Sequence, residues 1–218
     1  MISVAVVDYG MGNLRSVAKA LEHVAPEARV TVTASASAIA AADRVVVPGQ
    51  GAMPDCMREL DARGLRDSVI KATTNKPFLG ICIGLQMLFG ESEEGDASQS
   101  TRGLDILPGR VPRFPTAVMQ IEGSARLKVP HMGWNNVNQS DRAHPLWTGI
   151  ADSARFYFVH SFYVAPTTPG LTASTTDYGI RFTSAVSRDN IFAVQFHPEK
   201  SAQAGLQLLS NFMRWTPR

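Results

Sequence analysis

A cysteine between two glycines is the residue best suited to nucleophilic chemistry in this chain. Cys82 lies in Gly80-Ile-Cys-Ile-Gly84, and a helical pattern follows it directly. The pattern Gly-x-nucleophile-x-Gly is typical of a sharp strand-to-helix turn, where the glycines permit close packing and the central residue is strained and accessible. The partial positive charge of a helix N-terminus also favours a thiolate. Cys82 is therefore a candidate nucleophile, and an inert buried cysteine is the alternative.

A thiolate nucleophile needs a base. Of the five histidines, His23 is expected on a helix surface and His144 in a solvated turn before a proline. Three candidate bases remain: His131, His160 and His197. His197 precedes Glu199 by two residues, so their side chains point the same way in an extended chain and the carboxylate can orient the imidazole. Taken alone, a His-Pro-Glu segment is usually just a strand end, and its value here lies in occurring together with the Cys82 turn.

Acyl transfer to a thiolate also needs hydrogen-bond donors for the developing oxyanion. One predicted donor is the backbone N–H of Ile83, the residue after the nucleophile. A second is expected from the loop Pro48-Gly-Gln-Gly51, since Gly49 and Gly51 on either side of Gln50 let the Gly49–Gln50 peptide turn its N–H toward the site. By itself this loop also fits an ordinary turn.

The sequence gives no support for cofactor or metal chemistry. Gly10-x-Gly12 is followed by Arg15 where a dinucleotide fingerprint needs its third glycine, and no phosphate-loop motif is present. No Cys/His pair has the spacing of a zinc site. The acidic run 91–96 is predicted to be a solvated loop. We therefore expect neither a cofactor nor a metal.

Alternating strands and helices are predicted in the first half of the chain. The expected strands are 2–7, 29–33, 44–47 and 76–82. The expected helices are 14–25, 37–41 and a helical region 54–73 that is broken near Gly64. The first strand, 2–7, shows no polar alternation, as in a parallel strand covered on both faces, and the alternation of strands with helices predicts a parallel sheet. A helix is expected from Ile83 to Phe89, followed by a polar loop from Gly90 to Gly103.

The second half is predicted to be richer in short, largely antiparallel strands. These are expected at 109–114, 125–129, 134–137, 155–159, 162–165, 170–174, 180–186 and 191–196, before a helix at 201–215. The whole pattern predicts one α/β domain spanning residues 1–218. Its largely parallel, mixed central sheet would carry flanking helices and an additional antiparallel β region.

Composition limits the classes of function. The 218 residues are 44% hydrophobic and 18% charged with a net charge of +2, which fits a folded core and gives no electrostatic footprint for nucleic acid. No run approaches the roughly 18 apolar residues of a membrane span. Two cysteines in unrelated surroundings favour a reducing compartment. We therefore expect a cytoplasmic protein that binds neither nucleic acid nor membrane.

The combined motifs resemble a known family. The segments Gly80–Gln86 and His197–Glu199 resemble the class I, or triad, glutamine amidotransferases. Four further segments resemble the glutaminase subunits of imidazole glycerol phosphate synthases within that class: Val7–Leu14, Pro48–Gly51, Pro130–Asn135 and Tyr157–Tyr163. The resemblance covers essentially the whole chain and implies a flavodoxin-like fold.

The resemblance also implies an activity and a partner. Such subunits hydrolyse glutamine to glutamate and ammonia without a cofactor. The ammonia is channelled to a cyclase subunit of (β/α)8-barrel fold, with which they form a heterodimer. The cyclase forms imidazole glycerol phosphate and aminoimidazole carboxamide ribotide in histidine biosynthesis. Two alternatives stay open: a subunit of the anthranilate or pyridoxal phosphate synthase type, and a non-catalytic docking subunit.

Roles follow from the same resemblance, position by position. Cys82 matches the nucleophile, His197 the base and then acid, and Glu199 the residue that orients His197. Pro48–Gly51 matches the oxyanion strand, although the family usually has valine where this chain has Gln50. The positions matched to glutamine binding are Gln86, Glu94, Ser161 and Phe162. Those matched to the partner interface are Trp134, Tyr157 and Lys200.

Overall fold

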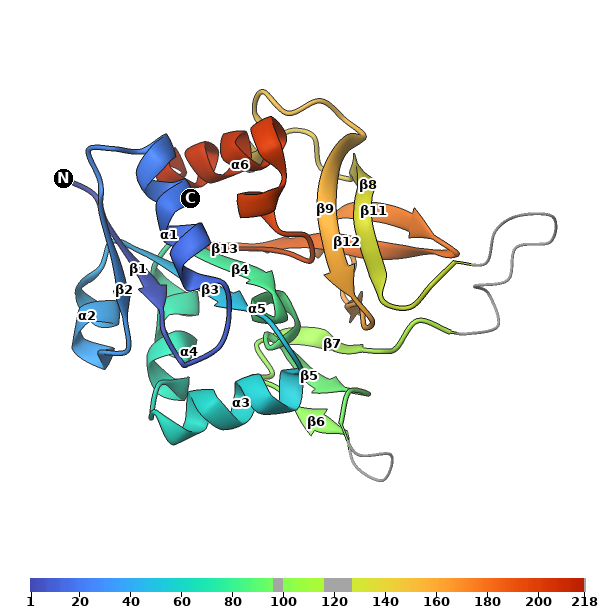
Figure 1. The fold of residues 1–218 in the computed structure, drawn as a ribbon, viewed down its shortest axis with the longest axis horizontal. Helices are drawn as coiled ribbons and strands as arrows, with labels where there is room; N and C mark the ends of the chain where they lie inside the picture. The colour runs from blue at the N-terminus through green and yellow to red at the C-terminus, as the bar shows by residue number, and fades with distance from the viewer. Residues whose placement is uncertain (96–99, 116–126, 218) are drawn as a thin grey trace.

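The computed structural model describes residues 1–95, 100–115 and 127–217 (Figure 1). Its first half alternates strands and helices, as predicted. The elements in chain order are β1 (Ser3–Val7), α1 (Leu14–Val24), β2 (Arg29–Thr33), α2 (Ala36–Ala41), β3 (Arg44–Gly49), α3 (Met53–Ala62), α4 (Arg66–Asn75), β4 (Phe78–Cys82) and α5 (Ile83–Gln86).

Five parallel strands form one side of the nine-stranded main sheet, with β2 at its edge. Their order is β2-β1-β3-β4-β13, with β13 (Ile191–Val194) beside β4. This is the 2-1-3-4-5 order of flavodoxin-like sheets. Helices α1 and α6 (Ala202–Arg214) pack together on one face, and α3 and α4 lie on the other (Figure 1). Because both faces are covered, every residue of β3, β4 and β13 is buried, which explains why these strands are apolar apart from Arg44 at the start of β3.

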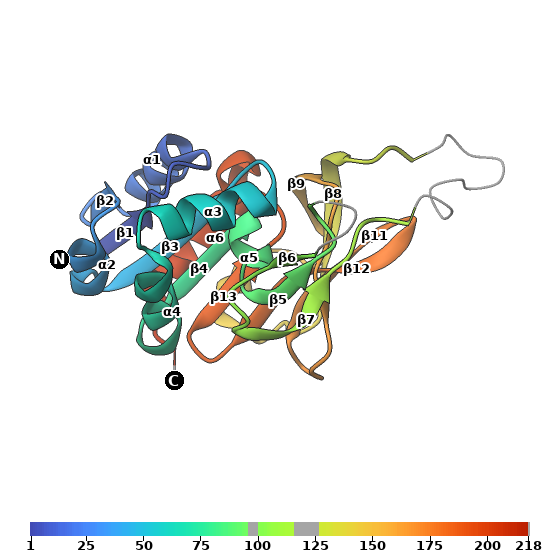
Figure 2. The ribbon, with the colours of Figure 1, turned by 90° about the horizontal axis from the view of Figure 1, so that it is seen from below.

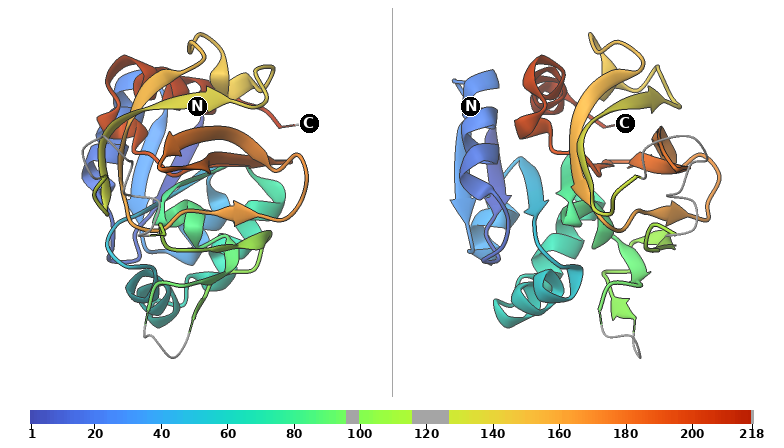
Figure 3. Two further views of the ribbon diagram at one scale, coloured as in Figure 1. Left: turned by 90° about the vertical axis from the view of Figure 1, so that its right-hand side faces the viewer. Right: turned by 45° about the vertical axis from the view of Figure 1, so that its right-hand side comes forward.

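Four antiparallel strands extend the same sheet. Strand β13 pairs with β12 (Ile180–Arg188), and β11 (Thr172–Tyr178), β8 (His131–Gln139) and β9 (Ala154–His160) follow in that order. Strands β8 and β9 curve away from the parallel part of the sheet (Figure 3). The prediction of an antiparallel second half is confirmed for these strands. Short 3-10 turns, η2 (Pro145–Trp147) and η3 (Pro198–Lys200), complete the region.

A second, four-stranded sheet lies beside the parallel strands (Figure 2). Its order is β10-β7-β5-β6, formed by β10 (Ala165–Pro166), β7 (Leu107–Val111), β5 (Phe89–Ser92) and β6 (Thr101–Arg102). Within the described part of the chain, no helix is long and apolar enough to cross a membrane.

Two predictions around this second sheet are wrong. The helix expected from Ile83 to Phe89 ends at Gln86, because the chain turns into β5 and buries Phe89 completely. The expected loop Gly90–Gly103 contains strand residues, since β5 and β6 pair antiparallel with Glu91 opposite Arg102. The polar side chains of this segment predicted a loop. Its backbone N–H and C=O groups nevertheless form hydrogen bonds with a neighbouring strand, which sequence polarity does not reveal.

Two predicted strands also differ. The one expected at 125–129 lies outside the described residues at 125–126, and 127–129 are not in a strand. The one expected at 162–165 is reduced to Ala165–Pro166 plus single bridges from Phe162 and Val164. A proline lacks the N–H that a strand interior needs, which limits this pairing.

Gly84 provides a test of how tightly the turn after β4 is packed. An added Cβ at Gly84 would overlap the Val47 carbonyl oxygen of β3. We therefore expect Gly84→Ala to lower the free energy of unfolding by about 1–3 kcal/mol in urea titrations. Gly64→Asn is the control, because Gly64 has a φ of 64° that asparagine tolerates and open space around it. Equal losses for the two variants would contradict this account.

Candidate active site

The turn after β4 presents Cys82 in a strained conformation. Cys82 has φ 57° and ψ −108°, a positive φ that side chains other than glycine rarely adopt. A Cβ at Gly80 would lie 2.6 Å from the Gly84 carbonyl oxygen, so both flanking glycines allow close packing, as the motif predicts. Helix α5 is a single turn, however, so its dipole supports the thiolate less than a full-length helix would.

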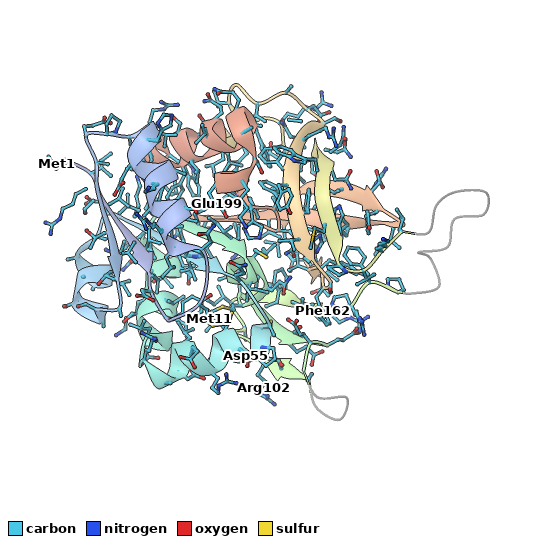
Figure 4. All side chains as sticks on the ribbon, in the orientation of Figure 1. Met1, Met11, Asp55, Arg102, Phe162 and Glu199 are labelled. Atoms are coloured by element: carbon cyan, nitrogen blue, oxygen red, sulfur yellow. The ribbon has the colours of Figure 1, made fainter. Side chains whose placement is uncertain are left out.

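Parallel pairing brings His197 to the same sheet edge as Cys82. Strands β4 and β13 are hydrogen-bonded neighbours, so the residues that follow them emerge side by side. His197 Nδ1 lies 3.0 Å from Glu199 Oε1, and the two side chains are 3% and 1% exposed. Figure 4 shows Glu199 at the foot of the final helix. The structure thus brings together the three side chains that the motifs singled out.

The charged groups of Cys82, His197 and Glu199, here called the trio, affect the pKa of His197. Burial alone lowers the pKa of His197. A negative charge on the nearby Cys82 sulfur and the hydrogen-bonded Glu199 carboxylate outweigh burial and raise the pKa to about 10. His197 Nε2 is buried and has no hydrogen-bond partner among the described residues, so it is available to a ligand in the pocket. The arrangement therefore favours a protonated His197 imidazolium beside the Cys82 sulfur.

Gln195 is a site residue that the sequence analysis missed. It is completely buried, and its Nε2 donates to Cys82 Sγ at 3.7 Å. Its Oε1 accepts from Gln86 Nε2 at 3.1 Å, and that same Gln86 nitrogen donates to the Phe162 carbonyl at 3.2 Å. A lone amide in the apolar run 191–196 was the available signal.

A pocket of about 290 Å³ opens beside Cys82 and His197. The predicted residues that line it, besides these two, are Gln50, Gly51, Ile83, Gln86, Glu94, Ser161 and Phe162. Phe162 lies near the lower ends of β8 and β9 in Figure 4. Gly49 lies behind this lining, where a Cβ would be 2.6 Å from Ile83 Cβ and 2.8 Å from Tyr9 Oη.

Acceptor oxygens in the pocket suit a ligand that donates hydrogen bonds. Gln86 Oε1 is buried and has no hydrogen-bond partner within the described residues. Glu94 Oε2 accepts from the Met53 N–H at 2.8 Å, and burial raises the pKa of this carboxyl. Within the described ranges, no three metal-ligating side chains gather in one place.

The remaining histidines do not serve the thiol. His131 and His160 bond to each other, with His131 Nδ1 2.9 Å from His160 Nε2, and both are buried. The prediction that His144 is solvated is wrong, because its ring packs on Phe192 and Trp215 and its Nδ1 accepts from Leu146 N–H. Burial lowers the pKa of His144 as a result.

Of the three predicted interface residues, Tyr157 and Lys200 adjoin His197 and Glu199, and Trp134 faces Tyr157. Trp134 is 44% exposed and faces Tyr157 across the β8–β9 pair, with ring centroids 6.2 Å apart. The Tyr157 carbonyl accepts from the His197 N–H at 2.9 Å. Lys200 follows Glu199 directly in η3 and is half-buried.

Comparison with known proteins defines the class. The family model described as "Glutamine amidotransferase class-I" matches residues 5–215. In fold, the chain is similar to a putative GMP synthase component from Thermoplasma acidophilum, with a TM-score of 0.69, 17% identity and coverage of 98% and 93% of the two chains. It is also similar to the glutaminase domain of Trypanosoma brucei CTPS, with a TM-score of 0.65, 17% identity and coverage of 100% and 96%. The chain has the class I glutamine amidotransferase fold.

Relatives with higher sequence identity define a family within this class. The chain is 65% identical over 217 residues to the imidazole glycerol phosphate synthase subunit HisH of Aromatoleum aromaticum, and 63% identical over 217 residues to that of Nitrosospira multiformis. Both alignments cover 100% of each chain. The protein belongs to the class I glutamine amidotransferases and, within them, to the HisH family of imidazole glycerol phosphate synthase subunits.

The coupling of the thiolate and the imidazolium is testable by titration. We expect Cys82→Ala to lower the pKa of His197, because the variant removes the largest charge that raises it while burial remains. Cys56→Ala is the matched control: burial raises the pKa of the Cys56 thiol to about 11, so it is neutral at pH 7. A pH titration followed by ¹⁵N NMR of the imidazole nitrogens measures the pKa of His197 in both variants. A His197 titration unchanged by the loss of Cys82 would contradict the ion pair.

Proposed function

We propose that the protein hydrolyses glutamine to glutamate and ammonia, as the glutaminase subunit of an imidazole glycerol phosphate synthase. The observation that carries the proposal is the buried Cys82–His197–Glu199 trio at a pocket, in a chain of the HisH family. The full-length identity to HisH subunits favours this assignment over an anthranilate or pyridoxal phosphate synthase subunit. The raised pKa of His197 favours catalysis over a docking role alone.

The geometry supports a two-step mechanism. The Cys82 thiolate attacks the side-chain amide carbon of glutamine, and the His197 imidazolium gives its Nε2 proton to the departing nitrogen. Ammonia leaves and a glutamyl thioester remains on the sulfur. His197, now neutral, removes a proton from water, whose oxygen attacks the thioester and releases glutamate. Glu199 holds the imidazole through Nδ1 in both steps.

Donors around the sulfur serve the oxyanion in this mechanism. The Ile83 N–H follows the nucleophile directly, and the loop containing Gly49, Gln50 and Gly51 flanks the same pocket. A missing oxyanion donor costs about 10²- to 10³-fold in rate. Rotation of the Gly49–Gln50 peptide is therefore sufficient to switch the activity.

In this proposal, the pocket wall that does not carry the oxyanion donors binds the substrate. Gln86 Oε1 and the Glu94 carboxylate are acceptors for the amino group and amide of glutamine, and the backbone of Ser161 and Phe162 forms the adjoining edge. A carboxylate near the amino group of an amino acid gives electrostatic complementarity. This arrangement supports a small zwitterionic substrate.

The partner in this proposal is the cyclase of the synthase, a (β/α)8 barrel that docks on the outer face of β8 and β9. Met132 and Trp134 are 62% and 44% exposed there, and strand alternation places both on the same face as Tyr157. Exposed aromatic and Met side chains are enriched at protein interfaces. Val159 continues this face to the pocket, so a partner seated on it receives ammonia directly.

The cytoplasm is the proposed compartment. Cys56 and Cys82 are both free, which suits a reducing environment. Neither the mechanism nor the partner interface calls for a cofactor.

Glutamine hydrolysis tests the nucleophile. We expect Cys82→Ala to reduce ammonia release from glutamine by at least about 10⁴-fold in the complex with the cyclase subunit, because no other group forms the thioester. The same complex should still use free ammonia to make imidazole glycerol phosphate. Cys56→Ala should keep both activities. Glutamine-dependent ammonia release by the Cys82→Ala complex would overturn the assignment.

Trp134 tests the docking face. We expect Trp134→Ala to weaken cyclase binding by about 2 kcal/mol, or about 30-fold in Kd, because a half-exposed aromatic is buried in the complex. The control is Val32→Ala on β2, which is 41% exposed at the opposite edge of the nine-stranded sheet. Calorimetric titration with the cyclase subunit measures both. If the two variants bind alike, the partner does not use this face.

A further inference from the structure

Two buried histidines on the inner face of β8 and β9 have no part in the mechanism above. His131 and His160 lie opposite each other in the strand register and are 3% and 5% exposed. The ring of His131 stacks on Tyr178 and Phe158, with centroids 3.9 and 4.8 Å away. A pair of imidazoles enclosed in this way must satisfy its polar atoms internally.

The position of each proton follows from the partners. His160 Nδ1 lies 2.7 Å from the Phe162 carbonyl oxygen, which only accepts, so Nδ1 carries the proton. In a neutral ring His160 Nε2 is then an acceptor, and it lies 2.9 Å from His131 Nδ1, which must donate. His131 Nε2 is left as an acceptor and faces Asn135 Nδ2 at 3.3 Å.

Asn135 forms the outer end of this chain of hydrogen bonds, and other contacts fix the orientation of its side-chain amide. Asn135 Nδ2 also donates to the Asp177 carbonyl at 3.0 Å, and its Oδ1 accepts from the Asn136 N–H at 2.8 Å. These two backbone partners define which end of the amide is the donor. The direction of donation therefore runs from Asn135 through both imidazoles to Phe162.

The pKa values of both rings lie below pH 5, so both rings are neutral between pH 5 and pH 8. Burial lowers the pKa of His131 to about 4. Burial and the neighbouring His131 lower the pKa of His160 to about 3. The direction of donation consequently does not change between pH 5 and pH 8.

The inner end of the chain is part of the pocket wall. The Phe162 carbonyl accepts from His160 Nδ1 and also from Gln86 Nε2, at 2.7 and 3.2 Å. Val159 to Phe162 line the pocket without a break, and the bond from His160 to Phe162 closes the turn around Ser161. Two donors from different elements thus hold one carbonyl at the edge where the substrate is expected.

We propose that Asn135, His131 and His160 form a fixed hydrogen-bond relay that positions the Phe162 carbonyl and Gln86 to receive the substrate. These are positioning residues: they act on the pocket wall and do not touch the reacting atoms. The identity of the substrate as glutamine rests on the proposed function. The relay itself rests on hydrogen-bond partners that do not depend on that assignment.

Imidazole ¹⁵N NMR tests the relay directly. We expect both His131 and His160 as Nδ1–H tautomers that do not titrate between pH 5 and pH 8. An Nε2–H tautomer at His160, or a titration of either ring in that range, would overturn the relay. This measurement needs no substrate, so its outcome is separate from that of the glutaminase assay.

Kinetics with glutamine in the cyclase complex test the positioning role. His160→Phe keeps a ring but leaves the Phe162 carbonyl without one donor. We expect KM for glutamine to rise about 10-fold while kcat stays within about 3-fold. His160→Asn places an amide N–H near the Nδ1 position and should restore most of the lost affinity. His144→Phe, a half-buried histidine packed elsewhere in the core, is the control and should leave KM unchanged.

Asn135→Leu is a second test of the positioning role, and it applies even if His160→Phe fails to fold. It removes the first donor of the relay from a half-buried position, and we expect a KM increase of about 3-fold with an unchanged kcat. A fall in kcat at constant KM for Asn135→Leu or His160→Asn would overturn the positioning role. Absence of glutaminase activity in the unsubstituted complex would instead refute the proposed function, and the NMR result would still decide the relay.

Discussion

The parallel pairing of β4 with β13 is the constraint on which the rest of the site depends. It sets the ends of two strands, separated by more than a hundred residues in sequence, side by side at one sheet edge. Cys82 ends one strand and His197 follows the other, so a negative charge on the sulfur stabilises the His197 imidazolium in a buried setting. Neither charge is favourable there alone, because burial disfavours an isolated ion. The pair is therefore a product of sheet topology.

Close packing around the turn keeps this pair in register. Gly80 and Gly84 let β3, β4 and α5 approach one another, and the positive φ of Cys82 is maintained by that packing. Strain of this kind persists only where the surroundings determine the conformation. The loop with Gln50 lies on the open side of the same turn. In the proposed mechanism, a strained nucleophile beside a glycine-flanked oxyanion loop would allow control by a partner.

Buried amides and imidazoles complete the polar framework. Gln195 joins the Cys82 sulfur to Gln86, and Gln86 joins the Phe162 carbonyl. His160 approaches that carbonyl from the other side. Since each of these hydrogen bonds constrains the orientation of an amide or an imidazole, the network favours one arrangement of the pocket wall. The antiparallel strands β8 and β9 thus link an exposed apolar face to the substrate edge.

The sequence alone determined the parallel half of the fold, the nucleophile turn and the His197–Glu199 relation, because these depend on local periodicity, glycine spacing and the i, i+2 geometry of an extended chain. It did not determine the short α5, the strands β5 and β6 within a polar segment, or the burial of His144, since each depends on partners far away in sequence. Gln195 became a hydrogen-bond partner of the sulfur, and His131 and His160 became partners of each other, through strand register. Only the tertiary structure decides such long-range pairings, because hydrogen bonds and burial are set by neighbours in space.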